Sequence, residues 1–315
     1  MTGVLQRSAL TLTRLAERWV PSAFVIACWL SFAVILAALA LTPTGPAAVV
    51  KAWGDGIWTL SSFAMQMCLV LMTGAIIADA PLVRRFLDAA ASWPKTDRGA
   101  VTFSALTSMV FCWFHWGLGA VASAFLARRI ALKRPGVDYR LLTATAYFGM
   151  GAIWHAGLSG SAPLLMATPK NFLEAQVGGT IPTAETVFAP FNLGLTGLVI
   201  AALTVLAWLM YPRDEDSFRL SPQARARLEE APAPALSAGE RGAWLRLWED
   251  SRAVPLAFGA LGAAYLALDW RAGTFSLTLE MLNLCFLALA VALHDSPAAF
   301  GRAAFPPFWG VALMW

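Results

Sequence analysis

The stretch Gly151–Phe172, GAIWHAGLSGSAPLLMATPKNF, places glycine, serine, proline and histidine where an apolar chain should continue a membrane helix. Pro163 lacks a backbone donor and disfavours helical geometry in the residue before it. We therefore predict that the helix of residues 141–167 is broken near Gly157–Ser161. Its second half would begin around Ser161, with free N–H groups and the positive end of its dipole inside the membrane. Such a helix end binds anions such as carboxylates.

The composition around this stretch is typical of a polytopic membrane protein. Of the 315 residues, 58% are hydrophobic and 13% are charged, which is far from the usage of a soluble domain. Seven apolar runs are long enough to cross a hydrocarbon core of about 30 Å, namely Ala23–Leu41, Ile57–Ala78, Val101–Leu126, Leu141–Ala167, Val187–Met210, Ala253–Leu268 and Ser276–Leu293. The predicted fold class is an all-α polytopic membrane protein.

The charges and cysteines argue against several other classes. The net charge of +4 is accompanied by no basic face with interleaved aromatics, so we expect no nucleic acid partner. The cysteines all fall inside apolar runs without metal or redox spacing, and they are interpreted as small core residues: Cys28, Cys68, Cys112 and Cys285. We expect no metal and no cofactor.

The basic residues predict the topology. Lys and Arg number 4 in residues 79–100, 5 in residues 127–140 and 7 in residues 211–252. Since cytoplasmic loops collect Lys and Arg, these segments and the N-terminus should share the inner side. A simple crossing by residues 101–126 would place the first two segments on opposite sides. We predict instead that residues 101–126 form a re-entrant hairpin, and an ordinary helix with a glycine packing notch is the alternative.

The centre of this segment, FCWFHWGLGA, places His115, Gly117 and Gly119 where a hairpin tip would fall. Glycine tolerates turns that other residues resist. Non-helical backbone at membrane depth survives only where protein or water satisfies it. The tip is therefore a candidate for lining a cavity.

The hairpin tip and the broken helix supply the candidate substrate-binding residues, which are His115, Trp116, Gly117, Gly119, His155, Ser159, Gly160 and Ser161. A histidine at membrane depth is a functional candidate by default, and neutral hydrogen bonding to a packed neighbour is the alternative. The two serine hydroxyls would either bond a carboxylate or repair the broken helix. No catalytic residue is predicted, because GLSGS lacks the glycine that a hydrolase nucleophile requires two positions after its serine.

The first residues and the long loop are interpreted as peripheral. Residues 1–21 are expected to form an interfacial amphipathic helix, because Arg7, Arg14 and Arg18 recur at roughly helical spacing. Residues 211–252 form a charged cytoplasmic loop that carries a flexible stretch and two tryptophans. Neither part is expected to contain a binding or catalytic site.

Six motifs occur in order along the chain: KAWGDGIWTLSSFAMQM at Lys51–Met67, WGLG at Trp116–Gly119, PGVDY at Pro135–Tyr139, GLSGSAPLLMATP at Gly157–Pro169, GALGAAYLA at Gly259–Ala267 and HDSPAA at His294–Ala299. Together they resemble the bacterial short-chain fatty acid transporter family. The resemblance runs from about residue 10 to residue 300. The chain departs from the family motif at His115, where the family carries Asn, and at Lys170, where it carries Gly.

The resemblance implies a fold of two inverted repeats, each with a re-entrant hairpin and a broken helix, as in the ion-transporter superfamily. Residues 22–210 then form the first transmembrane repeat, and residues 253–315 form the start of a second repeat that is truncated. Half of the expected binding site would be missing. The implied substrates are short-chain monocarboxylates such as acetoacetate or butyrate.

The resulting hypothesis is a secondary transporter for short-chain fatty acid anions. It would lie in the lipid bilayer of the bacterial inner membrane as a multi-pass protein with a cytoplasmic N-terminus. A proton or a sodium ion is the candidate coupling ion, and pairing into a homodimer is left open. Two alternatives stay open as well: a membrane-embedded, histidine-dependent acyl enzyme, and an inert truncated remnant.

Overall fold

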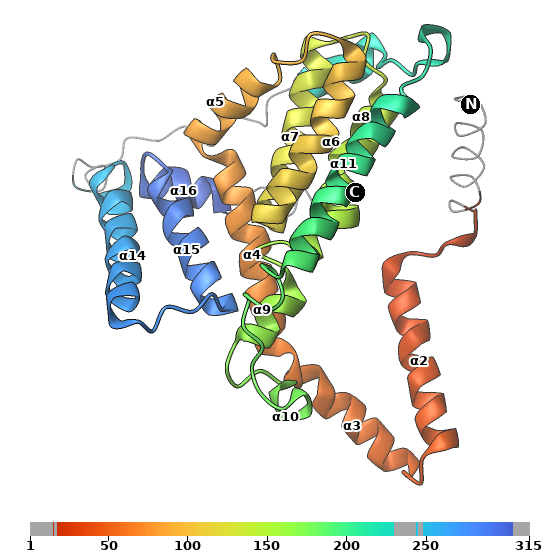
Figure 1. Cartoon of the computed structure of the whole chain (residues 1–315), viewed down its shortest axis with the longest axis vertical. Coiled ribbons are helices and arrows are strands. Elements are labelled where there is room, and N and C mark those ends of the chain that lie inside the picture. The colour runs from red at the N-terminus through yellow and green to blue at the C-terminus, as the bar shows by residue number, and fades with distance from the viewer. Residues whose placement is uncertain (1–14, 16–17, 230–243, 245–247, 305–315) are drawn as a thin grey trace. The chain divides into compact units, whose positions relative to one another are not determined.

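The chain is an all-α polytopic membrane protein, which confirms the predicted class. The structure, a computed structural model, describes residues 15, 18–229, 244 and 248–304, and no strand occurs among them (Figure 1). Within this part of the chain, four helical stretches are long and apolar enough to cross a membrane: Phe24–Leu41, Pro46–Asp79, Pro190–Met210 and Ala253–Ala272.

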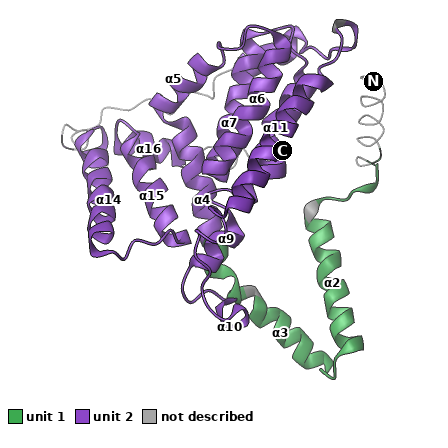
Figure 2. Cartoon of the chain, in the orientation of Figure 1, with its two compact units in different colours: residues 1–65 green, residues 66–315 purple. Residues whose placement is uncertain are grey.

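The chain divides into two compact units, residues 1–65 and residues 66–315 (Figure 2). The first unit contains α2 (Ala23–Leu41) and α3 (Pro46–Thr59). Large apolar side chains are exposed all along α2, as expected of a helix that faces lipid. The predicted interfacial helix at residues 1–21 falls almost entirely outside the described residues.

The second unit carries the hairpin and the broken helix. Its longer helices, in chain order, are α4 (Ser61–Asp79, which begins in the first unit), α5 (Pro81–Ala90), α6 (Asp97–Phe114), α7 (Trp116–Lys133), α8 (Tyr139–Ala146), α11 (Pro190–Met210), α12 (Pro222–Glu229), α14 (Ala253–Ala272), α15 (Leu279–Ala292) and α16 (Pro297–Ala304). Between α8 and α11 lie a π-helix (Gly149–Ile153), a 3-10 turn (Trp154–Ala156) and the short helices α9 (Ser161–Ala167) and α10 (Glu174–Val177).

The helices α6 and α7 lie side by side as a hairpin (Figure 1), and a single residue joins them. This residue, His115, has extended backbone angles (φ −157°, ψ 108°). Near the tip the two backbones approach so closely that a Cβ on Gly119 would lie 2.6 Å from the backbone nitrogen of Cys112. Val101 and Leu126, both fully buried, belong to the core that the hairpin forms with its neighbours.

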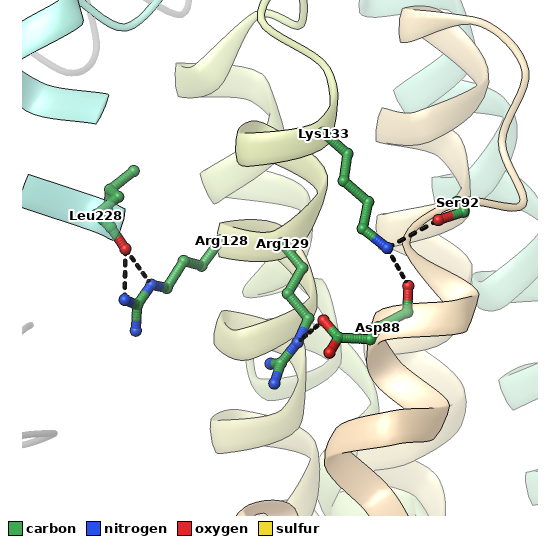
Figure 3. Close-up of polar contacts among 6 residues, drawn as sticks. All are labelled: Asp88, Ser92, Arg128, Arg129, Lys133 and Leu228. Atoms are coloured by element: carbon green, nitrogen blue, oxygen red, sulfur yellow. Dashed lines mark hydrogen bonds and ion pairs between the residues drawn. The ribbon is translucent and has the colours of Figure 1, made fainter. Parts of the chain in front are cut away.

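The base of the hairpin is held together by basic side chains. The Nε atom of Arg134 donates to Asp97 Oδ1 at 2.7 Å, and its other guanidinium nitrogens donate to two backbone carbonyls before α6. In Figure 3, Arg129 pairs with Asp88, and Lys133 donates to the Asp88 carbonyl and to the Ser92 hydroxyl. The start of α6 and the end of α7 therefore lie at the same end of the hairpin. The re-entrant path through a membrane stays a prediction.

The segment after α11 is attached to the same end. Arg128 donates to the carbonyl of Leu228 on α12 (Figure 3), and Arg225 donates to the carbonyl of Leu132. The buried carboxylate of Asp138 caps α8 and also accepts a hydrogen bond of 2.7 Å from the backbone N–H of Phe218. The first part of the predicted loop at residues 211–252 is thus docked against the hairpin base.

The helix α15 packs against α14 on one side and against α4 on the other. It packs along α14 through small residues, and a Cβ on Gly262 would lie 2.6 Å from the Cβ of Ala288. On its other side, Ala290 belongs to a buried cluster with Ile76 and Ile77 of α4. With 14 residues, α15 is shorter than the predicted run of residues 276–293 and shorter than the roughly 20 residues of a full span.

Candidate functional site

The helix of residues 141–167 is interrupted at residues 157–160, between the 3-10 turn and α9. The extended backbone of Gly157 (ψ −178°) passes directly over the hairpin. A Cβ at this position would lie 2.2 Å from the carbonyl oxygen of Trp113, and the N–H of Leu158 donates to that same oxygen at 2.7 Å. The interruption is therefore seated on the last turn of α6.

Ser159 joins the interruption to the hairpin tip. Its side chain is fully buried, and its Oγ atom accepts a hydrogen bond of 2.8 Å from the N–H of Trp116, the first residue of α7. The first N–H groups of a helix have no partner within the helix. Ser159 thus satisfies a free donor of the hairpin tip, so that the two predicted halves of the site meet at this bond.

His115 caps both helices of the hairpin. Its N–H donates to the Phe111 carbonyl at 2.9 Å, and its Nδ1 atom accepts from the N–H of Leu118 at 3.0 Å. Because Nδ1 accepts, the neutral ring carries its hydrogen on Nε2. This Nε2 atom is buried and has no hydrogen-bond partner among the described residues. The His115 ring lies against Phe286 of α15, with 3.9 Å between the ring centroids.

Trp116 provides a second donor of the same kind. Its Nε1 atom is buried, and no partner for it occurs in the described part of the chain. Its ring contacts Trp154 edge to face at 6.3 Å between centroids. An indole N–H can only donate. The hairpin tip therefore holds two buried N–H groups that have no acceptor among the residues that the structure describes.

The candidate glycines are close-contact positions. A Cβ on Gly117 would lie 2.4 Å from the carbonyl oxygen of Val70 on α4, and Gly119 faces Cys112 of α6. Gly160 is buried, and a Cβ there would lie 2.7 Å from the carbonyl oxygen of His155. These glycines permit the backbones of α4, α6, α7 and the interruption to approach one another.

The last two candidate residues, Ser161 and His155, are not fully buried. Ser161 is half-buried at the start of α9, and its hydroxyl lies 3.2 Å from the sulfur of Met67. His155 is exposed, and its ring rests against Trp154. Pro163 falls in the first turn of α9, where its missing N–H costs nothing. Ala162 before it is helical, against our expectation for a residue that precedes proline.

Two polar residues that the sequence analysis missed support the interruption. The side-chain amide of Asn192 on α11 donates to the carbonyls of Ala156 and Val187, at 3.0 and 2.8 Å. The Oγ1 atom of Thr168, just after α9, accepts from the N–H of Leu279 at 3.1 Å. Asn192 could have been identified from the sequence, because it is a single Asn inside an apolar run. In the described residues, no group of three or more His, Cys, Asp or Glu side chains is placed to hold a metal ion.

Comparison with known proteins places this geometry in a family context. Residues 4–310 match the family model described as Short chain fatty acid transporter. A protein of Escherichia coli (strain K12) is 38% identical over 292 residues, which cover 93% of this chain and 65% of the relative. A protein of Haemophilus influenzae is 32% identical over 332 residues, covering 99% of this chain and 73% of the relative. Both are provisionally named short-chain fatty acid transporters. No solved structure matches the chain.

Proposed function

Because the chain belongs to the short chain fatty acid transporter family, we propose that it acts in the secondary transport of short-chain monocarboxylate anions across the bacterial inner membrane. The substrates are of the acetoacetate and butyrate class. A proton or sodium gradient drives the uptake. Of the two histidines considered for carrying a proton, the exposed His155 is the candidate, because Nδ1 of His115 already accepts the N–H of Leu118. The comparisons lend no support to a histidine-dependent acyl enzyme.

The observation that carries the proposal is the pair of buried donors at the hairpin tip, His115 Nε2 and Trp116 Nε1, for which the described part of the chain supplies no acceptor. A buried donor without an acceptor costs about 1–3 kcal/mol, and a carboxylate supplies acceptors only. Neither residues 101–126 nor residues 141–167 contain a Lys or Arg. An anion at this depth would therefore be held by N–H groups and helix ends. Ser161, at the start of α9, offers a hydroxyl to the same substrate.

The contacts at the hairpin base support the orientation. Residues 88–97, residues 128–134 and the segment around Leu228 belong to the three most basic loops, and direct hydrogen bonds join them. Basic loops collect on the cytoplasmic side. On this proposal the hairpin base is cytoplasmic, the tip with His115 points into the membrane, and the N-terminus is cytoplasmic as well.

Uptake of labelled butyrate into proteoliposomes that contain the purified chain tests the proposal. We expect saturable uptake that depends on an imposed proton or sodium gradient. His115→Ser keeps an N-cap acceptor for the Leu118 N–H and removes the imidazole Nε2 donor, while Trp116→Phe keeps an aromatic ring and removes Nε1–H. A hydrogen bond to a charged group contributes about 1.5–3 kcal/mol, so each variant should raise the KM for butyrate roughly 10- to 150-fold.

Trp154→Phe is the matched control, because it also removes an indole N–H beside the tip but not one of the two unpartnered donors. Its KM should stay within about twofold of the native value. Absence of uptake by correctly inserted native chain overturns the transport function. Native KM values in both tip variants overturn the assignment of the site.

A further inference from the structure

A polar cluster lies between α4 and α15, outside the site just described. The side-chain nitrogen of Gln66 donates to Glu280 Oε1 at 3.0 Å, and the side-chain nitrogen of Asn283 lies 3.4 Å from the backbone carbonyl of Gln66. Glu280 and Asn283 are one helical turn apart on α15, so the three side chains form one group. Asn283 is only 7% exposed.

The two amide oxygens of this cluster are left without partners. Each amide nitrogen faces an acceptor, the Glu280 carboxylate or the Gln66 carbonyl, which fixes the orientation of both amides. Gln66 Oε1 and Asn283 Oδ1 are then buried, and neither has a hydrogen-bond partner among the described residues. Rotating either amide would remove its hydrogen bond and bring two oxygen atoms together. The cluster therefore combines two free carbonyl oxygens with a carboxylate.

We propose that Gln66, Glu280 and Asn283 bind a sodium ion. Oxygen atoms are the ligands that hard cations prefer. The single carboxylate balances one positive charge. Mg²⁺ demands octahedral geometry and usually keeps several waters, and Ca²⁺ takes six to eight oxygen ligands. Further ligands come from water or backbone carbonyls. Glu280 itself is exposed, so its carboxylate is accessible to an ion, whereas the two unpartnered amide oxygens beside it are buried.

The position of the cluster connects the ion to the broken helix. Met67, next to Gln66, contacts the hydroxyl of Ser161 at the start of α9. Leu279, next to Glu280, donates to the hydroxyl of Thr168 at the other end of α9. An ion that draws α4 and α15 together thus fixes both ends of α9. The role of the bound ion in coupling rests on the proposed transport function, whereas the binding of the ion does not depend on that function.

Binding of radioactive sodium to the detergent-purified full chain tests the inference, with potassium as the competing ion. We expect saturable binding that excess unlabelled sodium displaces and potassium does not. Glu280→Gln keeps the shape and can still bond Gln66, but it removes the charge. Asn283→Leu removes a free oxygen at similar volume. Both should weaken sodium binding at least tenfold.

Asp55→Asn is the matched control, because Asp55 is an exposed carboxylate that pairs with Lys51 within α3. Its sodium affinity should equal that of the native chain. Native binding by monodisperse Glu280→Gln and Asn283→Leu proteins overturns the site, and so does absence of sodium binding by the native chain.

Butyrate uptake in proteoliposomes separates the two proposals. Sodium binding without any butyrate uptake supports the ion site and contradicts the transport function. Uptake that a proton gradient drives equally well with and without sodium, in a chain that binds no sodium, supports the function and overturns the ion site.

Discussion

Replacing Gly74 by alanine is the sharpest test of how the hairpin tip is packed. A Cβ on Gly74 would lie 2.2 Å from the carbonyl carbon of Gly117 and from the nitrogen of Leu118. Carbon atoms in contact prefer about 3.5–4.0 Å, so α4 and the start of α7 would have to separate by more than roughly 1 Å. The atoms in the way are backbone atoms, which cannot rotate aside. Overpacking costs typically 1–3 kcal/mol, and we expect about 3 kcal/mol here.

The matched control is Gly197→Ala in α11, where the new Cβ meets nothing within 4 Å. Alanine is favoured over glycine inside a helix by about 1 kcal/mol, so this variant should be as stable as the native chain or more stable. Thermal unfolding in detergent, followed by the loss of the monodisperse peak, compares the two variants. Equal midpoints for Gly74→Ala and Gly197→Ala would refute the close approach of α4 and α7.

Three further variants test the contacts around the tip and the base. Ser159→Ala leaves the partly buried N–H of Trp116 without its acceptor and should destabilise the chain by about 1–3 kcal/mol in the same unfolding assay. Arg134→Ala removes three hydrogen bonds at the hairpin base and should lower the stability by about 1–2 kcal/mol. Lys51→Ala removes one exposed ion pair and should lower it by less than about 0.5 kcal/mol. Equal losses of stability in the two variants would contradict a structural role of the Arg134 contacts. Asp138→Ala should release the segment after α11 and speed its cleavage by trypsin, and an unchanged cleavage rate would count against that contact.

The membrane-spanning character could be predicted from composition alone, because long apolar runs mark hydrocarbon depth. Helix ends could not be predicted in the same way. The apolar run at residues 101–126 lies inside α6 and α7, which extend to Asp97 and Lys133. These outer turns are polar because they form the base of the hairpin, where charged side chains bond one another. Apolar composition locates the membrane, whereas capping and tertiary contacts locate the ends.

The site was only partly readable from the sequence. Glycine and serine signals pointed to an interruption near residues 157–161, because such residues weaken a helix wherever they gather. The hydrogen-bond partners of these residues could not be predicted, since the bond from Trp116 to Ser159 joins residues 43 positions apart. Histidine is also not among the usual N-cap residues, so its place at the start of α7 gave no local signal. The π-helix at Gly149–Ile153 likewise depends on packing against α6, because a Cβ on Gly149 would lie 2.1 Å from the Ser108 carbonyl oxygen.

The spacing of the Gln66 cluster along the chain has a consequence for biogenesis. The hairpin of α6 and α7 can assemble as soon as the translocon releases it, because its helices are consecutive. Glu280, whose carboxylate accepts from the Gln66 amide, follows Gln66 by 214 residues, and at 5–20 residues per second the ribosome needs about 10 to 40 s to make that stretch. During this interval the amide of Gln66 sits in the bilayer without its carboxylate. The nascent chain therefore passes through a stage in which α4 carries an unpaired polar group, and this is the stage at which insertion factors have most to shield.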